Sequence, residues 1–321
     1  MELIKSFNIK KILSKYSLVL ILVIIMAICA MANSNFLTAS NLINVFRQQS
    51  VFILLAFGEM VLIICGQLDL SSGSTVALAG ILSVMSYKST GSMSIGFAVA
   101  IAVAVTVNFF NGIMVTRFKA PAFIATLATQ TIARGAALFI TNGQNVYEIG
   151  NYSVVGQGSV GPIPIPVIIM LVGFVCMAYI MRNTKWGRST YAVGGNIEAA
   201  NASGINTKMV IMKAFLLNGA LVGISSVMFM SRVNGGLPNG ATGYEMDALT
   251  ATIIGGTSFS GGIGSVGGTI LGAFIVGFLN NIMNLLSINS YIQQMLRGAI
   301  IAGAVIWDIY SKGKQNYKKS K

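Results

Sequence analysis

The chain has 321 residues, of which 55% are hydrophobic and 9% charged, and a net charge of +13. Because a soluble domain carries about 25% charged residues, this composition excludes an ordinary water-soluble protein and favours one whose surface faces lipid. The chain has no His, and its three Cys stand singly in apolar stretches, which removes the commonest general base, metal ligands and nucleophile pairs. No nucleic-acid partner is expected, because the basic residues lie in short ends and loops rather than on a soluble face.

Ten apolar stretches with the character of membrane-spanning helices follow one another along the chain. A spanning helix needs about 20 mostly apolar residues. The predicted spans are 17–32, 51–66, 73–87, 95–116, 122–141, 165–181, 209–231, 248–259, 267–286 and 291–310. The stretches 73–87 and 248–259 are short and rich in Gly, Ser or Thr, which is typical of broken or re-entrant helices. The expected fold is therefore all-α: a polytopic transmembrane helical bundle of about ten spans, forming a single domain over residues 1–321.

The positions of the basic residues predict how the bundle is oriented. Sixteen of the 21 Lys and Arg fall on the side of the N-terminus, three fall on the opposite side, and Arg134 and Arg297 lie within spans. An excess of Lys and Arg marks the cytoplasmic side of a membrane. Both termini are therefore expected in the cytoplasm, with 182–208 as the largest cytoplasmic loop and 142–164 as the largest external one.

Glu59 falls near the middle of the predicted span 51–66, and Arg134 falls well inside 122–141. Charged side chains within a membrane are costly and normally face a partner or water. Because these two helices are expected to run in opposite directions, both residues lie at a similar depth, and we predict an intramembrane charge pair between them. The alternative is that Arg134 faces a transport path.

Two apolar runs are interrupted by similar small-residue segments, 64–74 and 254–264. Such breaks free backbone groups to face a cavity, and a repeated break is typical of internal duplication in transporters. The candidate pathway or gating residues in these segments are Asp69, Ser71, Ser74, Gly256, Thr257 and Ser258. The alternative is a pair of tight turns between close-packed helices, in which Asp69 caps the helix that follows.

Further polar residues lie at a span end or within spans. Glu245 and Asp247 precede the apolar run at 248–259, where acidic side chains stabilise a helix N-terminus; docking of an external partner is the alternative. Six Asn lie within spans and are expected mainly to join helices by hydrogen bonds. They are Asn108, Asn111, Asn218, Asn280, Asn281 and Asn284.

The loop 182–208 predicts a short helix across the cytoplasmic end of the bundle. Gly194 and Gly195 are expected to form a turn, Asn196 to cap a helix through Glu198–Ala202, and Gly204 to end that helix. A helix with small side chains can seat in a groove of another protein, and the alternative is an ordinary connector lying at the membrane surface. The chain has no phosphate-binding P-loop sequence, so any active transport draws its energy from a partner or an ion gradient.

This loop resembles the cytoplasmic coupling loop of ribose-type permeases of ABC importers, whose pattern is Gly-Gly-Asn-x-x-Ala-Ala-x-x-Ser-Gly-Ile. The matching residues are Gly194, Gly195, Asn196, Ala199, Ala200, Ser203, Gly204 and Ile205. Three further stretches are similar to the same family: 69–74, 120–127 with the pair 134–135, and 243–248 with the glycine-rich runs 255–258 and 267–272. The resemblance covers roughly residues 40–310.

The resemblance implies the membrane-spanning subunit of an importer for a sugar or sugar-like solute, located in a bacterial inner membrane. The implied partners are a second permease subunit, identical or different, an extracytoplasmic solute-binding protein, and a cytoplasmic ATPase. The ATPase docks on the coupling loop, for which the residues are Gly194, Gly195, Asn196, Glu198, Ala199, Ala200, Ser203 and Gly204. This chain itself is expected to be no enzyme and to bind no cofactor, with ATP and Mg²⁺ held by the partner. The alternatives are an ion-coupled secondary transporter and an ABC permease for a nucleoside or branched-chain amino acid.

Overall fold

The computed structural model describes residues 16–319, apart from the side chains of residues 304, 307–309 and 311–319. The described chain is helical except for a two-stranded antiparallel hairpin, β1 (Ser159–Val160) and β2 (Ile163–Pro164). The helices are α2 (Ser17–Ala32), α3 (Ala39–Ile64), α4 (Ser72–Thr90), α5 (Met93–Thr116), α6 (Ala122–Thr141), η1 (Gly150–Ser153), α7 (Val154–Gln157), α8 (Ile165–Asn183), α9 (Lys185–Gly195), α10 (Ile197–Ala202), α11 (Thr207–Arg232), α12 (Tyr244–Ile254), α13 (Val266–Leu285) and α14 (Ser290–Lys319). The expected all-α polytopic bundle is confirmed.

Each of the ten predicted spans coincides with a helix, although the lengths differ. Within the described residues, six helices are long and apolar enough to cross a membrane: α3, α5, α6, α8, α11 and α13. Helix α3 begins at Ala39 rather than near residue 51, because Thr38 accepts a hydrogen bond from the Asn41 amide and caps it there. Helix α12 has only 11 residues, which is too short to span a bilayer, as its small-residue composition predicts.

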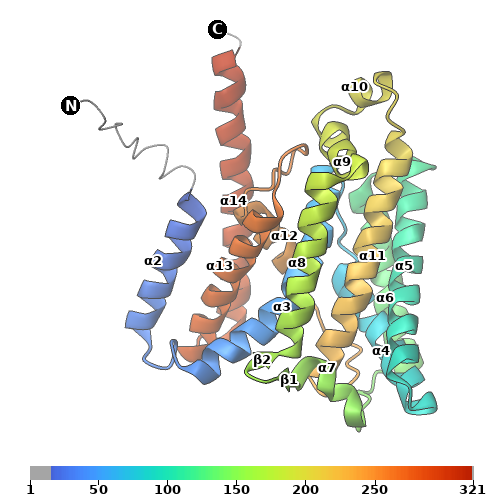
Figure 1. Ribbon diagram of the computed structural model, residues 1–321, viewed down its shortest axis with the longest axis vertical. Helices are drawn as coiled ribbons and strands as arrows, with labels where there is room; N and C mark the ends of the chain where they lie inside the picture. Colours follow the sequence, from blue (N-terminus) through green and yellow to red (C-terminus); the bar gives the residue numbers. More distant parts are fainter. Residues whose placement is uncertain (1–15, 320–321) are drawn as a thin grey trace.

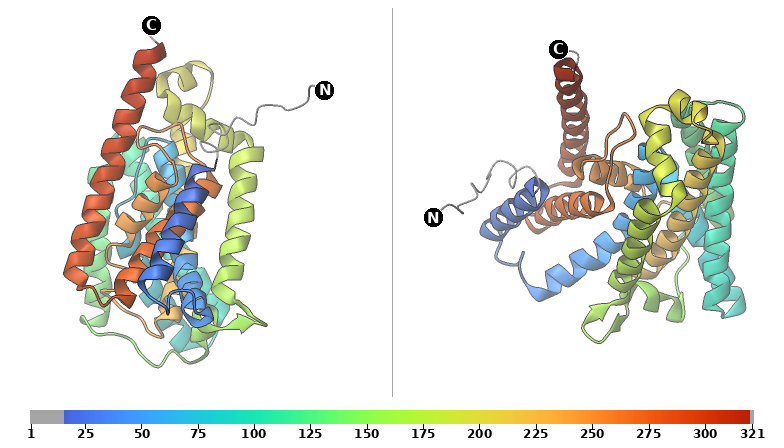
Figure 2. Two further views of the ribbon diagram at one scale, coloured as in Figure 1. Left: turned by 90° about the vertical axis from the view of Figure 1, so that its left-hand side faces the viewer. Right: turned by 45° about the horizontal axis from the view of Figure 1, so that its top comes forward.

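The helices form one bundle whose long axes run roughly from end to end of the molecule (Figure 1). Helices α9 and α10 lie at one end, together with the start of α2 and the C-terminal half of α14, while α7 and the β1–β2 hairpin lie at the other. Helices α2 and α14 stand at the margin of the bundle in the right-hand view of Figure 2. The described ends of the chain therefore share the end that carries α9 and α10.

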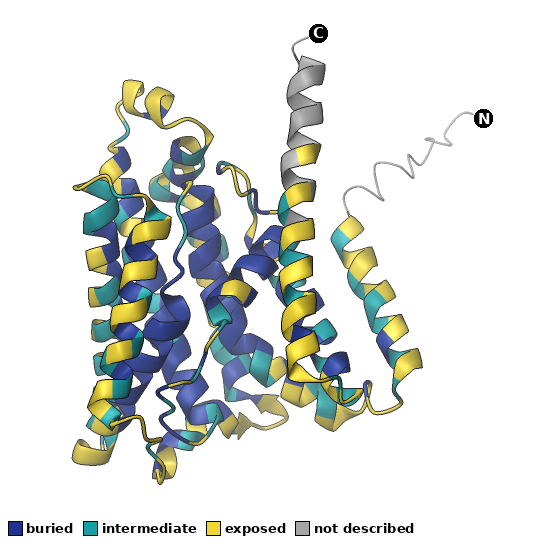
Figure 3. Cartoon of the chain, turned by 180° about the vertical axis from the view of Figure 1, so that it is seen from behind, coloured by how far each residue is buried: buried dark blue, intermediate teal, exposed yellow. Residues whose placement is uncertain are grey.

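Burial separates central from peripheral helices (Figure 3). In the most apolar stretch of α3, 89% of residues are buried, and 67% in α11, against 22% in each of α5, α6 and α8. Large apolar side chains on these outer helices stay exposed, among them Phe139 and Val175. An outer surface of this kind suits the hydrocarbon of a bilayer, whereas α3 and α11 supply the protein core.

Glycine allows the central helices to approach one another closely. On α11, a Cβ at Gly219 or Gly223 would meet the backbone of α5 at distances below 3.0 Å. On α13, a Cβ at Gly272 would collide with the Ala251 carbonyl oxygen of α12. Small residues four apart on a helix face are a common means of packing helices in membranes, so the many Gly in this chain serve packing as well as turns.

Candidate functional site

Helices α9 and α10 form a projecting hairpin, which we call the α9–α10 knob (residues 185–204). Thr184 caps α9 by accepting a hydrogen bond from the Gly187 amide at 2.9 Å, and the Asn196 side chain caps α10 by accepting one from the Ala199 amide at 2.9 Å. After α10, Gly204 adopts a φ of +80°, a conformation that favours glycine, and its amide bonds back to the Asn201 carbonyl oxygen at 2.9 Å. The predicted Asn196 cap and Gly204 terminus are therefore confirmed.

The structure gathers all eight residues predicted for the coupling loop into the α9–α10 knob, with two differences in detail. Gly194 and Gly195 are the last residues of α9 rather than a separate turn. Helix α9 was not predicted from the sequence, although Trp186, Thr190 and Val193 follow Thr184 at helical spacing. On α10, Glu198 and Ala199 are exposed, but Ala200 is buried within the chain itself.

The base of the α9–α10 knob contacts the core through backbone. A Cβ at Gly194 would collide with the Ile64 carbonyl oxygen at the end of α3, and the same oxygen accepts a hydrogen bond from the Gly262 amide at 2.9 Å. The Tyr191 hydroxyl donates to the Gly264 carbonyl oxygen at 3.1 Å. A displacement of the α9–α10 knob would therefore act directly on the end of α3 and on the loop that follows α12.

A network of buried polar side chains lies deeper, close to the middle of α11; we call it the polar centre. Asp69 accepts hydrogen bonds from the Ser71 amide at 2.8 Å, the Ser72 hydroxyl at 2.9 Å and the Asn218 side chain at 2.7 Å. Asn218 also donates to the Asn108 side-chain oxygen at 2.9 Å. Asp69 thus holds the turn just before α4 and connects it to Asn218 of α11. The predicted role of Asp69 as the N-cap of α4 is wrong, because the N-cap residue is Ser71 and no side chain caps this helix.

The N-terminal ends of α4 and α12 meet at the polar centre. A Cβ at Gly73, the second residue of α4, would collide with Glu245, the second residue of α12, and with the Ala241 carbonyl oxygen. Glu245 accepts a hydrogen bond from the Gln130 side chain of α6 at 3.2 Å. Acidic groups at a helix N-terminus offset its partial positive charge, so the carboxylates of Asp69 and Glu245 hold two helix starts inside the bundle.

The predicted charge pair between Glu59 and Arg134 is wrong. Glu59 accepts hydrogen bonds from the Asp69 amide at 3.2 and 3.3 Å, whereas Arg134 donates to the carbonyl oxygens of Pro238 and Gly240 at 2.6 and 2.8 Å. Similar depth along two helices did not bring the side chains together, because each satisfies freed backbone groups of a non-helical segment instead. Arg134 interacts electrostatically with Glu245 rather than with Glu59.

The candidate gating residues fall into two separate places. Asp69, Ser71 and Ser74 are buried in the polar centre, where the Ser71 hydroxyl accepts a hydrogen bond from the Asn111 side chain at 3.0 Å. The residues 256–258 lie in the loop after α12, where the Ser258 amide bonds to the Ile263 carbonyl oxygen at 2.9 Å. The segment 64–74 thus ends in the buried polar centre, whereas the segment 254–264 forms a turn beside the α9–α10 knob.

A second polar region joins α12 to α14, and its only indication in the sequence is the position of Arg297 within a predicted span. Among the described residues, one ion pair is found, between Arg297 Nη1 and Asp247 Oδ2 at 3.4 Å. Arg297 Nε also donates to the Asn280 side-chain oxygen at 3.2 Å. Asp247 is 5% exposed and is paired with Arg297 inside the protein. This contradicts the interpretation of Asp247 as a docking residue for an external partner.

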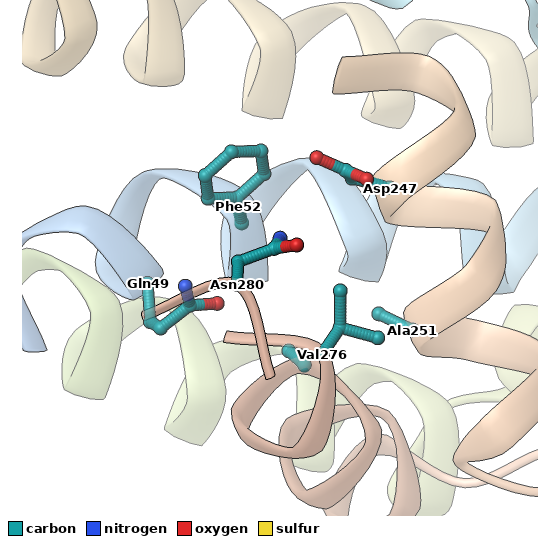
Figure 4. A pocket seen from close by; sticks show the side chains of 7 residues that line it. Gln49, Phe52, Asp247, Ala251, Val276 and Asn280 are labelled. Carbon is teal, nitrogen blue, oxygen red and sulfur yellow. The ribbon is translucent and has the colours of Figure 1, made fainter. Parts of the chain in front are cut away.

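A cavity of about 580 Å³ adjoins this ion pair; we call it the α12–α14 cavity. Its lining is mixed: Met246 and Ile301 supply apolar surface, and Asp247, Gln293 and Arg297 are among its polar side chains. Figure 4 shows the small pocket on the other side of Asp247, where Gln49, Phe52, Asp247, Ala251, Val276 and Asn280 surround one space from α3, α12 and α13. Cavities that bind small molecules commonly measure about 300–1,000 Å³ and carry a few polar groups, so this region can hold a small hydroxylated solute.

Comparison with known proteins identifies the family. Residues 41–305 match the family model described as "Branched-chain amino acid transport system / permease component". The ribose import permease protein RbsC of Haemophilus influenzae is 35% identical over 310 residues, covering 95% of this chain and 96% of that protein. The chain belongs to the ribose-type permease family of ABC importers. Within this permease family, RbsC of Bacillus subtilis is 36% identical, with 89% and 90% of the two chains covered.

The L-arabinose transport system permease protein AraH of Escherichia coli is 32% identical, with 98% of this chain and 95% of that protein covered. No solved structure matches the chain. As a member of this permease family with six helices long and apolar enough to cross a membrane among its described residues, the chain is a multi-pass protein of the bacterial inner membrane.

Proposed function

We propose that this permease translocates a monosaccharide or similar hydroxylated solute as one subunit of an ABC importer. The observation that carries the proposal is the 32–36% identity, over nearly the whole chain, to proteins named as ribose and L-arabinose permeases. The family model's description names branched-chain amino acids, and a permease for such an amino acid or for a nucleoside is the second candidate. The α12–α14 cavity carries Asp247, Gln293 and Arg297, whose donors and acceptors suit a hydroxylated solute.

The α9–α10 knob is the proposed seat of a separate cytoplasmic ATPase. It projects from one end of the bundle, its outer face carries Glu198 and Ala199, and its base touches the end of α3 through Gly194. Small side chains on the outer face allow close docking into a groove, while the backbone contact at the base passes movement on to the central helix. ATP and Mg²⁺ belong to the partner in this scheme, and this chain binds neither.

The α12–α14 cavity is the proposed contact region for the solute. Asp247, Arg297 and Gln293 offer acceptors and donors that match sugar hydroxyls. The short helix α12 and the marginal helix α14 bound this cavity, so its shape can change when either helix moves. The polar centre, by contrast, is the proposed structural support of α4 and α12.

The proposed topology has about ten spans with both termini in the cytoplasm. It is supported by the ten helices at the predicted positions and by the common end shared by α2, α14 and the α9–α10 knob, together with the basic excess on that side. A second permease subunit completes the pathway, and an extracytoplasmic binding protein delivers the solute to the end that carries α7 and the β1–β2 hairpin.

Uptake by intact cells tests the solute class. A strain that lacks this chain, and the same strain complemented with it, receive radiolabelled ribose, L-arabinose, leucine and adenosine in parallel. We expect complementation to restore accumulation of a sugar and to leave leucine and adenosine unchanged. Restoration of leucine or adenosine uptake, with both sugars unchanged, would overturn the sugar proposal and favour the second candidate.

A further inference from the structure

A groove opens on the outer surface at the end of the bundle that carries the α9–α10 knob. It measures about 320 Å³ and is lined by Ile180 of α8, Thr184, Trp186 of α9, and Lys213 and Leu217 of α11. We call it the α8–α11 groove. Neither the polar centre nor the α12–α14 cavity contributes a residue to it, so it is separate from the proposed transport path.

The lining surface is apolar, and Lys213 contributes its methylene stem to it. Ile180 and Leu217 supply aliphatic surface, while Lys213 is exposed and makes no hydrogen bond or ion pair with any residue that the structure describes. Lys213 lies six residues after the start of α11, or about 9 Å along the helix. A Lys on that turn can extend its ammonium toward the headgroup level while its methylene stem stays against apolar surface.

Trp186 lines the α8–α11 groove and is hydrogen-bonded to α11. Its indole Nε1 donates to the Val210 carbonyl oxygen of α11 at 3.3 Å, and Thr184 caps α9 directly beside it. Tryptophan is enriched where membrane helices meet the headgroup layer. An indole beside this groove therefore suits the level at which a lipid headgroup meets its acyl chains.

The charge around the α8–α11 groove is strongly one-sided. Four further basic side chains are exposed on the adjoining turns of α8, α9 and α11: Arg182, Lys185, Arg188 and Lys208. Between residues 165 and 232 the single acidic residue is Glu198, which lies on α10. An anion is thus attracted to this part of the surface, and basic pockets between membrane helices are typical binding sites for acidic lipid headgroups.

We propose that the α8–α11 groove binds one anionic phospholipid, with its phosphate at Lys213 and an acyl chain along Ile180 and Leu217. Charge complementarity selects the occupant. A zwitterionic lipid offers the same phosphate, but its own cation is repelled by the surrounding basic side chains, and a sugar has no acyl chain to lie on the aliphatic wall. The proposal requires a bilayer around the chain and is independent of which solute the permease carries.

Fluorescence of Trp186 provides a direct test, because the chain has two Trp and replacing Trp307 by Phe leaves Trp186 as the only indole. Purified W307F protein in neutral detergent is titrated with brominated phosphatidylglycerol or, separately, brominated phosphatidylcholine, since bromine quenches an adjacent indole. We expect half-quenching by phosphatidylglycerol at about fivefold lower lipid content than by phosphatidylcholine, with the difference shrinking at high salt.

Lys213→Ala, in the W307F background, is expected to abolish this preference, and Lys213→Arg to retain most of it. Lys208→Ala is the matched control, since Lys208 is exposed at the start of the same helix but does not line the groove. Equal quenching by both lipids in the parent would overturn the proposal. So would an unchanged preference in Lys213→Ala, or a loss of equal size in Lys208→Ala, which would indicate diffuse surface attraction. Loss of a subunit dimer in Lys213→Ala without any lipid preference would make the groove a protein interface instead.

Discussion

At the scale of single residues, buried polar side chains in this permease provide one another with hydrogen-bond partners. Asn218 illustrates the point: one amide group donates to Asp69 of the segment before α4 and to Asn108 of α5. All three side chains are fully buried. Water cannot replace a lost partner at such a position, so each removal exposes the full desolvation cost of the remaining polar groups.

Asn218→Ala should therefore lower the free energy of unfolding by about 1–3 kcal/mol, because the acceptors on Asp69 and Asn108 lose their donor. The measurement is the thermal unfolding midpoint of the purified protein in one detergent. Asn145→Ala is the matched control, since Asn145 is exposed and bonds only to Tyr147, and we expect less than about 0.5 kcal/mol there. Equal destabilisation by both substitutions would show that the polar centre contributes no specific stability.

Arg134 supplies a second prediction at this scale. Its guanidinium donates through one nitrogen, Nη1, to two carbonyl oxygens of the segment before α12. The side chain of Lys ends one bond short of that nitrogen, so its ammonium does not reach the same position. Arg134→Lys is expected to leave the charge in place yet loosen that segment, so that a protease cuts between residues 233 and 243 at least several-fold faster. Glu59→Gln is the matched control, because Glu59 bonds to the Asp69 amide and not to this segment. Equal cleavage of the segment in both variants would contradict the role given to Arg134.

At the scale of elements, helix contacts depend on glycine where two backbones touch. In α13, Gly272 lies against the Ala251 carbonyl oxygen, whereas nothing lies within 4 Å of a Cβ built at Gly267 of the same helix. Gly272→Ala is expected to separate α12 from α13 and to lower the unfolding midpoint clearly. Gly267→Ala should leave the midpoint unchanged or raise it slightly, because Ala is the better helix former. A midpoint that is unchanged in Gly272→Ala would contradict the close contact.

The α9–α10 knob supports a prediction about the partner. Ala199 is exposed on α10, whereas Ala200 is buried in the chain itself, so a bulky residue at Ala199 blocks docking without disturbing the fold. Ala199→Trp should reduce the ATPase that co-purifies with the tagged permease at least tenfold. Ser89→Trp, an exposed small-to-large change at the opposite end, should not alter it. Normal retention of the ATPase by Ala199→Trp would remove the α9–α10 knob as its seat.

Much of this element-level picture follows from the sequence because its signals are local. Apolar length predicted the ten helix positions, and the Asn196 cap and Gly204 terminus predicted α10. The predictions that were wrong concern contacts between segments far apart in the chain. The partners of Arg134 are more than 100 residues away, and the Asp247–Arg297 pair joins residues 50 apart, so depth along a helix could not identify either. The helix α9 was missed although its half-buried residues recur at helical spacing.

At the scale of the whole molecule, the two ends of the bundle lie on opposite sides of the membrane in the proposed topology. One end carries the α9–α10 knob, the start of α2 and the C-terminal half of α14; the other carries α7 and the β1–β2 hairpin. In a protein whose own Cys are replaced, Asn145→Cys should react with a membrane-impermeant maleimide in intact cells. Glu198→Cys should react only after the cells are opened. The reverse pattern would invert the proposed topology.

The account as a whole requires that solute movement through this permease be driven by a separate motor. The most direct measurement is uptake of radiolabelled ribose or L-arabinose, with the binding protein present, into sealed proteoliposomes that contain the permease with or without its ATPase. We expect accumulation only when the ATPase and ATP are both supplied, and none when a proton or sodium gradient replaces them. Accumulation by the permease alone under an ion gradient would contradict the central claim.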